Sequence, residues 1–290
     1  MSCYAEKRGM INVKVTCTEF FRLNRNLSRR LFICLRKDNE MIFKETANKQ
    51  MPTIILLHGG GLSSWSWQSV IEQLQFEFHV VTPIIDGHGE NGDEEFISIQ
   101  DSAKKLINYI DTNCNGKVFA VGGLSIGAQI ITEVLSQRAD ISKYSVIESA
   151  LVYPIKGTAA ITVPAYKLFY GLVKKRWFSK LQAKTLCVPA DMFEQYYQDS
   201  LKISQQSLIN LTLSNGNYNL KSSIGDTKSK VLIIVGENEI GIMRKSAQRL
   251  HEAIKDSELY IAPAMKHGQM SLVYPKKYVE LLKLFFAKYS

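Results

Sequence analysis

The sequence predicts an α/β fold built on a mostly parallel sheet, with helices on both faces and an inserted helical cap. Short apolar, β-branched runs alternate with segments whose apolar residues recur at helical spacing, the pattern of strand–helix–strand units. Two of these runs end directly in glycine-rich turns, at residues 58–61 and 123–127. The alternation stops between residues 153 and 225, which are rich in aromatic residues and poor in strand-like runs. We therefore expect the cap in that interval.

The core elements follow one another along the chain. The apolar runs predict strands at residues 53–57, 78–83, 117–123, 231–235 and 259–262, and another strand ending near Glu148. Apolar residues on one face predict helices near residues 67–74, 101–112, 247–254 and 276–288. The expected organisation is an N-terminal extension with first strands (1–45), a first core part (46–152), the cap (153–225) and a second core part (226–290).

Length and composition agree with one large domain carrying an insertion, because 290 residues with 46% hydrophobic content can bury a sizeable core. The five cysteines are scattered and follow no disulfide or zinc-binding spacing, so we expect no metal and a reducing, cytoplasmic location. The first residues lack the apolar core of a signal peptide, and no run has the length of a membrane span.

The net charge of +9 is unevenly distributed. Residues 1–45 carry ten Lys and Arg against five Asp and Glu, and residues 153–225 carry nine against three. The remainder carries seventeen against nineteen. Basic surface can attract an anionic membrane, an acidic ligand or nucleic acid. Because no nucleic-acid-binding motif accompanies it, we expect solvated basic faces and no nucleic-acid partner.

The turn at Gly123-Leu124-Ser125-Ile126-Gly127 lies between a predicted strand and a predicted helix. A sharp strand-to-helix turn leaves room only for small residues on either side of its apex, and the two glycines supply them. Such a turn exposes the Ser125 hydroxyl beside the positive N-terminus of the following helix. The pattern points to Ser125 as a nucleophile, although a chance glycine loop would carry the same letters.

The sequence His58-Gly59-Gly60-Gly61 follows another buried strand. Glycines there let backbone N–H groups approach a ligand closely, as an oxyanion requires. The expected pair of donors is the N–H of Gly60 and the N–H of Ile126. A phosphate-binding loop is the competing interpretation, but the lysine of such loops is missing and no G-x-G-x-x-G spacing occurs.

A carboxylate and a histidine each follow a strand near the C-terminus. Glu239 comes after residues 231–235 and His267 after residues 259–262, the strand ends where open α/β sheets place their ligands. Of the five histidines, only His267 has this context. Glu148, at the end of an earlier strand, competes with Glu239 for the role of acid, whereas Glu237 is expected to face solvent.

These motifs together resemble the α/β-hydrolase superfamily, in its capped, carboxylesterase- or lipase-like serine hydrolase form. The resemblance spans residues 53–268 and implies Ser125 as nucleophile, His267 as general base and Glu239 as the acid that orients it. Two departures stand out. Most relatives carry Asp where this chain has Glu239, and Ile84 replaces an Asp that supports the loop ending in Gly87-His88-Gly89.

The resemblance implies cleavage of a carboxylic ester through an acyl-enzyme, without a cofactor. A serine nucleophile argues against epoxide hydrolase and dehalogenase chemistry. Thioesterase, lactonase, C–C hydrolase and acyltransferase activities stay open, as does a slow-turnover ligand sensor. The aromatic cap favours an apolar small-molecule substrate, and its candidate contacts are Tyr166, Phe169 and Trp177. The sequence does not indicate the oligomeric state.

Overall fold

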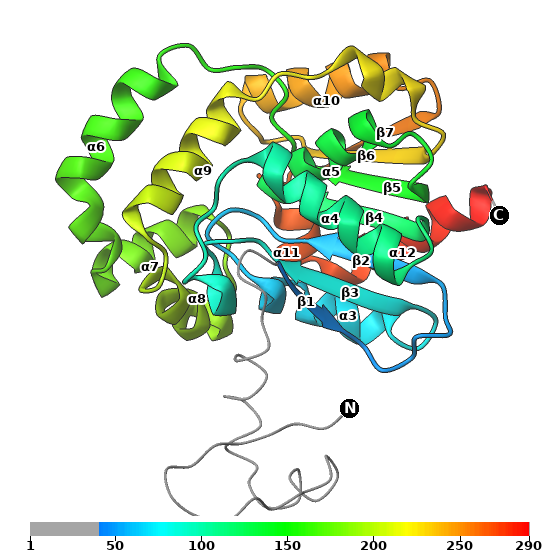
Figure 1. Ribbon diagram of the computed structural model, residues 1–290, viewed down its shortest axis with the longest axis horizontal. Coiled ribbons are helices and arrows are strands. Elements are labelled where there is room, and N and C mark those ends of the chain that lie inside the picture. The colour runs from blue at the N-terminus through cyan, green and yellow to red at the C-terminus, as the bar shows by residue number, and fades with distance from the viewer. Residues whose placement is uncertain (1–40, 290) are drawn as a thin grey trace, which may run out of the picture. The chain divides into compact units, whose positions relative to one another are not determined.

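A computed structural model describes residues 41–289, which form one seven-stranded sheet in the order β1-β3-β2-β4-β5-β6-β7 (Figure 1). The strands are β1 (Ile42–Glu45), β2 (Thr53–Leu57), β3 (His79–Ile84), β4 (Val118–Leu124), β5 (Ser142–Glu148), β6 (Lys230–Gly236) and β7 (Ser257–Ala262). Strand β1 is antiparallel to β3, and every other pairing is parallel. The predicted α/β architecture with a mostly parallel sheet is therefore confirmed.

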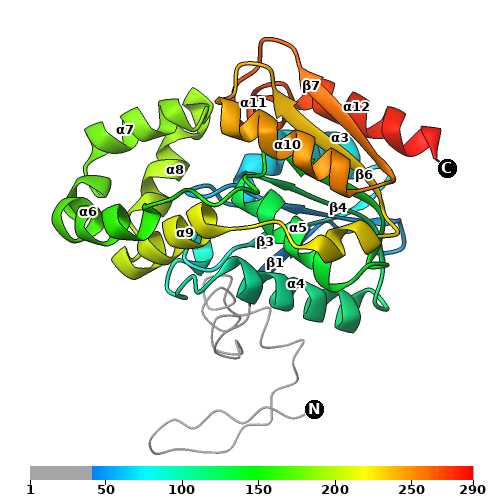
Figure 2. The same cartoon turned by 90° about the horizontal axis from the view of Figure 1, so that it is seen from above.

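Helices cover both faces of the sheet. Helices α4 (Ile99–Asn113), α5 (Ile126–Gln137) and α10 (Gly241–Ala253) pack on one face, and α3 (Gln68–Leu74) and α12 (Pro275–Lys288) on the other (Figure 2). Successive strand residues point to opposite faces, so Ile55 belongs to the first core and Ile54 to the second. Burial on both faces explains why the central strands, β2 to β6, read as continuous apolar runs, whereas the edge strands β1 and β7 are only partly buried.

Local signals account for the helix ends. The Ser98 hydroxyl accepts a hydrogen bond from the Asp101 N–H at 3.0 Å, so α4 begins at Ile99, slightly before the predicted start. Pro275 occupies the first position of α12, where its missing N–H costs no hydrogen bond. Trp67 lies in a 3-10 turn, η1 (Ser64–Trp67), rather than in α3 itself.

Four α-helices lie between β5 and β6, to one side of the sheet (Figures 1 and 2). They are α6 (Thr158–Val173), α7 (Arg176–Thr185), α8 (Phe193–Ser200) and α9 (Gln205–Asn217). The Lys174 amine ties the end of α6 to the α8–α9 turn, since it donates to the carbonyl oxygens of Ser200 and Ile203.

Within residues 41–289, the remaining shorter elements are η2 (Gly89–Asn91), η3 (Ala190–Met192), η4 (Ser222–Asp226) and α11 (Gln269–Val273). Across residues 41–289, no helix combines the length and the apolar character needed to cross a bilayer. Of the predicted N-terminal segment 1–45, all but the last five residues lies outside the described range.

Candidate active site

Ser125 sits at the apex of a strained turn between β4 and α5. Its backbone angles are φ 56° and ψ −115°, outside the regions that a serine ordinarily adopts. A Cβ atom on Gly123 would lie 2.4 Å from the Gly127 carbonyl carbon, and one on Gly127 would lie 2.5 Å from the Leu57 carbonyl oxygen. Both glycines are therefore required for the turn and for the close approach of α5 to β2.

A hydrogen-bonded chain links Ser125 to the two residues expected beside it. The Ser125 Oγ lies 3.0 Å from the His267 Nε2, and the His267 Nδ1 lies 2.8 Å from the Glu239 Oε2. Glu239 lies between β6 and α10, and His267 lies between β7 and α11. Parallel strands bring their carboxyl ends to one edge, so residues far apart in sequence meet there.

The Glu239 carboxylate is buried and held by donors on both oxygens. Its Oε1 accepts from the Ser149 hydroxyl at 2.7 Å and from the Gly236 N–H at 2.8 Å, while its Oε2 accepts from His267. Burial by itself would raise the pKa of Glu239, but these hydrogen bonds and the nearby imidazole hold that pKa below its ordinary value. An ionised carboxylate only accepts, so His267 donates from Nδ1 and keeps the Nε2 lone pair for the Ser125 hydroxyl.

Glu148, the competing acid, has a different partner. It is fully buried at the end of β5, and its Oε1 accepts from the Ser271 N–H at 3.2 Å. Its Oε2 has no hydrogen-bond partner within residues 41–289. Burial raises the pKa of Glu148 to about 7. Its backbone carbonyl accepts from the Ser125 N–H at 2.9 Å, so Glu148 supports the turn while His267 bonds to Glu239.

His58 orients the glycine loop next to this chain. Its Nδ1 donates to the Gly59 carbonyl oxygen at 2.9 Å, and its Nε2 accepts from the Ile85 N–H at 3.1 Å. Burial lowers the pKa of His58 to about 3, with a smaller effect of the adjacent His88, so the ring is neutral. In a planar trans peptide the N–H points opposite to the carbonyl, so anchoring the Gly59 oxygen aims the Gly60 N–H the other way.

Gly60 and Ile126 are neighbours, as an oxyanion site would require. A Cβ atom on Gly60 would lie 3.7 Å from the Ile126 Cγ2 and 3.3 Å from the Leu211 Cδ2. Ile126 is the first residue of α5, so its N–H has no acceptor within the helix. The arrangement can offer two N–H donors beside the Ser125 hydroxyl.

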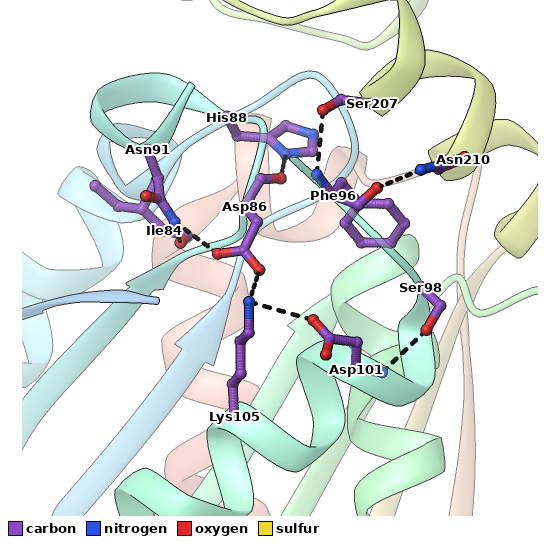
Figure 3. A network of polar contacts seen from close by, with 10 residues as sticks. All are labelled: Ile84, Asp86, His88, Asn91, Phe96, Ser98, Asp101, Lys105, Ser207 and Asn210. Carbon is purple, nitrogen blue, oxygen red and sulfur yellow. Dashed lines mark hydrogen bonds and ion pairs between the residues drawn. The ribbon is translucent and has the colours of Figure 1, made fainter. Parts of the chain in front are cut away.

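A polar network supports the loop that follows β3 (Figure 3). The buried Asp86 carboxylate accepts from the Lys105 amine of α4 at 2.6 Å and from the Asn91 amide at 2.8 Å. Lys105 also lies 3.2 Å from Asp101. Asp86, two residues after Ile84, thus ties the loop to α4.

Helix α9 contacts the continuation of that loop. The Phe96 N–H donates to the Ser207 hydroxyl at 3.1 Å, and the Asn210 amide donates to the Phe96 carbonyl at 2.9 Å (Figure 3). These bonds hold the helix that carries Leu211 over Gly60.

A cavity of about 140 Å³ lies beside Gly60 and Gly61, under the inserted helices. Its apolar lining includes Val173, Leu186, Tyr196, Leu208 and Leu211. None of the three aromatic residues considered from the sequence lines this cavity. Tyr166 is half-buried and bonded to Thr212, whereas Phe169 and Trp177 are 55% and 63% exposed. The helical positions of Phe169 and Trp177 turn these two side chains away from the core, and aromatic composition alone does not show the direction of a side chain.

Ser149 is a site residue that sequence reasoning missed. It follows Glu148 at the end of β5, and β5 pairs with β6, whose end carries Glu239. A hydroxyl at the end of the neighbouring strand is the signal that could have identified it. Within the part of the chain that the structure describes, no group of three or more His, Cys, Asp or Glu side chains is arranged to hold a metal ion.

Comparison with known proteins places the chain in a family. The model of the alpha/beta hydrolase family matches residues 54–281. The chain belongs to the alpha/beta hydrolase family. An esterase from Exiguobacterium antarcticum has the same fold, with a TM-score of 0.71 and 15% identity over 85% of this chain and 95% of that one.

Two curated relatives are similar over shorter regions. An AB hydrolase superfamily protein of Gibberella zeae is 26% identical over 141 residues, 48% of this chain and 49% of its own length. A pimeloyl-[acyl-carrier protein] methyl ester esterase of Vibrio vulnificus is 26% identical over 102 residues, 35% of this chain and 38% of its own. The alignments thus span half or less of either relative.

Proposed function

We propose that this alpha/beta hydrolase is a serine hydrolase that cleaves a carboxylic ester through an acyl-enzyme. The observation that carries the proposal is the hydrogen-bonded chain from the Ser125 hydroxyl through His267 to the buried Glu239 carboxylate. The strained turn at Ser125 and the neighbouring Gly60 and Ile126 add to it.

In the proposed reaction, the His267 Nε2 takes the Ser125 proton as Oγ attacks the ester carbonyl carbon. The N–H groups of Gly60 and Ile126 donate to the resulting oxyanion. Glu239 stabilises the imidazolium, which then gives its proton to the departing alcohol. Water attacks the acyl-enzyme in the same way, releasing the acid and restoring the serine.

We propose that α6–α9 form the cap and that the substrate carries an apolar group. The supporting observation is the cavity next to Gly60, where six aliphatic side chains and Tyr196 outnumber the polar side chains of His88, Gln182, Asp199 and Ser200. Two of the similar proteins are named esterases, which agrees with ester cleavage without identifying the ester.

The test is the Ser125→Ala variant, assayed with a chromogenic short-acyl ester and a fluorophosphonate probe. We expect turnover to fall by at least about a thousandfold and labelling to vanish, because no other residue supplies the attacking oxygen. Ser69→Ala, at a half-buried serine outside the site, is the matched control and should behave as the unmodified chain. Labelling that persists in Ser125→Ala refutes the assignment. In the unmodified chain, a single burst of ester cleavage followed by a stall would indicate a slow-turnover ligand sensor.

A further inference from the structure

Helix α6 presents an unusually apolar face to solvent. Its inner face is held by Tyr166, bonded to Thr212, and by the Tyr170 hydroxyl, which donates to the Ile203 carbonyl. On the other side, Ile161 and Leu168 are 71% and 73% exposed. The exposed positions that share this face are Ala160, Pro164, Lys167 and Gly171. A water-facing helix surface ordinarily carries charged and polar side chains instead.

Helix α7 also exposes apolar side chains to solvent, and lysines lie beside them. Trp177 and Leu181, one turn apart, are 63% and 58% exposed, while Ser179 and Ala183 face inward and are buried. Lys180 and Lys184 are exposed beside them. A tryptophan and a leucine flanked by lysines form an amphipathic surface of the kind found at membrane interfaces.

The charge of this region has one sign. Residues 149–190 contain seven Lys and Arg and no Asp or Glu. Lys174 is occupied by backbone carbonyls, and Arg176 is paired with Glu194 at 2.7 Å. Lys167, Lys175, Lys180 and Lys184 have no carboxylate partner among residues 41–289.

We propose that the outer faces of α6 and α7 dock on an anionic lipid surface. In this arrangement Ile161, Leu168, Trp177 and Leu181 enter the boundary between headgroups and acyl chains, and the lysines contact anionic headgroups. Figures 1 and 2 show α6 on the side of the inserted helices away from the sheet, with α7 following it.

Charge argues against the other candidates to cover this surface. Residues 1–40 carry nine Lys and Arg against four Asp and Glu, so their net charge has the same sign as the surface. A second copy packed symmetrically on α6 and α7 would bring the same lysines face to face. An anionic bilayer complements both the apolar and the positive character.

The experiment measures binding of the full chain to vesicles of phosphatidylcholine alone and of phosphatidylcholine with one-quarter phosphatidylglycerol. We expect binding to the anionic vesicles, weaker by tenfold or more at high salt because salt screens the lysines. Trp177 provides a direct signal, since Trp67 is buried and Trp65 is half-buried and bonded to Asp199. Its fluorescence should shift to the blue on binding, and Trp177→Phe should abolish that shift.

Matched variants distinguish vesicle binding through α6 and α7 from nonspecific binding to vesicles. Leu168→Ser should weaken vesicle binding at least fivefold, whereas Leu284→Ser, at an equally exposed leucine of α12, should not. Lys180→Gln should weaken it about fivefold and Lys104→Gln on α4 should leave it unchanged. The proposal would be overturned if the chain did not bind the vesicles or if both members of a pair of variants had equal effects. It would also be overturned by a concentration-dependent dimer that Leu168→Ser dissociates. The vesicle assay requires no ester turnover, so its result is independent of the proposed catalytic function.

Discussion

At the residue scale, the hydrogen-bond donors around Glu239 favour the ionised form of this carboxyl group next to His267. Three hydrogen bonds reach this carboxylate, from Ser149, Gly236 and His267. Glu148, which lies nearby at the end of β5, receives one bond through its side chain and has one unpartnered oxygen within residues 41–289. Because the lower pKa belongs to Glu239 and the raised pKa to Glu148, the two carboxyl groups differ in ionisation at neutral pH.

The two carboxyl groups should therefore respond differently to the same substitution. Glu239→Gln should reduce kcat by about a thousandfold or more, because an amide cannot stabilise the imidazolium and can favour the wrong tautomer. Glu148→Gln should stay within about tenfold, since an amide resembles the protonated acid. Ester turnover by both variants decides the point. An exchange of the two effects would assign the acid role to Glu148.

Glu148 should also make stability depend on pH. Its pKa is about 7 in the folded chain against 4.5 for an ordinary glutamate, so between these values the folded state binds more protons. The stabilisation is complete below about pH 4.5 and is lost as the pH rises through 7, a loss on the order of 3 kcal/mol. Urea unfolding of the unmodified chain and of Glu148→Gln at pH 5 to 8 measures it. The free energy of unfolding of the unmodified chain should fall relative to that of Glu148→Gln as the pH rises, and parallel curves would contradict the prediction.

At the scale of elements, close backbone contact joins α5 to the sheet. Gly127→Ala would place a Cβ 2.5 Å from the Leu57 carbonyl oxygen, so α5 must move away from β2. We expect a loss of about 2–4 kcal/mol in the free energy of unfolding. Gly171→Ala in α6, where no atom lies within 4 Å of the added methyl, should instead stabilise the chain by up to about 1 kcal/mol. Equal effects in thermal or urea unfolding would argue against tight packing at Gly127.

The core elements could be predicted from the sequence because the central strands, β2 to β6, are buried on both faces and each glycine turn has a local steric cause. The order of Ser125, Glu239 and His267 along the chain also predicted that they could meet, since all three follow strands. Ser149 and Leu211 carry no local motif that marks them as site residues. Each acts through a contact with a distant segment, Ser149 across neighbouring strands and Leu211 from α9. Trp177 was expected near the substrate, but only the packing of α7 shows which of its faces is buried.

At the scale of the whole described molecule, positive charge and the apolar cavity occupy different places. The exposed lysines of α6 and α7 lie on the outer faces of those helices. Among residues 41–289, no lysine or arginine lines the cavity beside Gly60, whose wall combines aliphatic side chains with Tyr196, His88, Gln182, Ser200 and Asp199. Asp199, which also lines the cavity, is bonded to the Trp65 indole and lies 3.8 Å from Lys202. We therefore expect substrate selection to depend on apolar contacts in the cavity and attraction to an anionic lipid surface to depend on the exposed lysines.

A salt titration should separate these two forces. For neutral soluble esters, kcat/KM should rise with acyl chain length from acetate until the cavity is full, by at most about fourfold per methylene buried. It should change little between 0.05 and 0.5 M salt, because neutral esters present no charge to screen, whereas binding to anionic vesicles should fall over the same range. The measurement is kcat/KM for neutral and anionic esters at both ionic strengths. A large preference for the anionic ester that salt removes would place the lysines at the substrate and would contradict an apolar selection pocket.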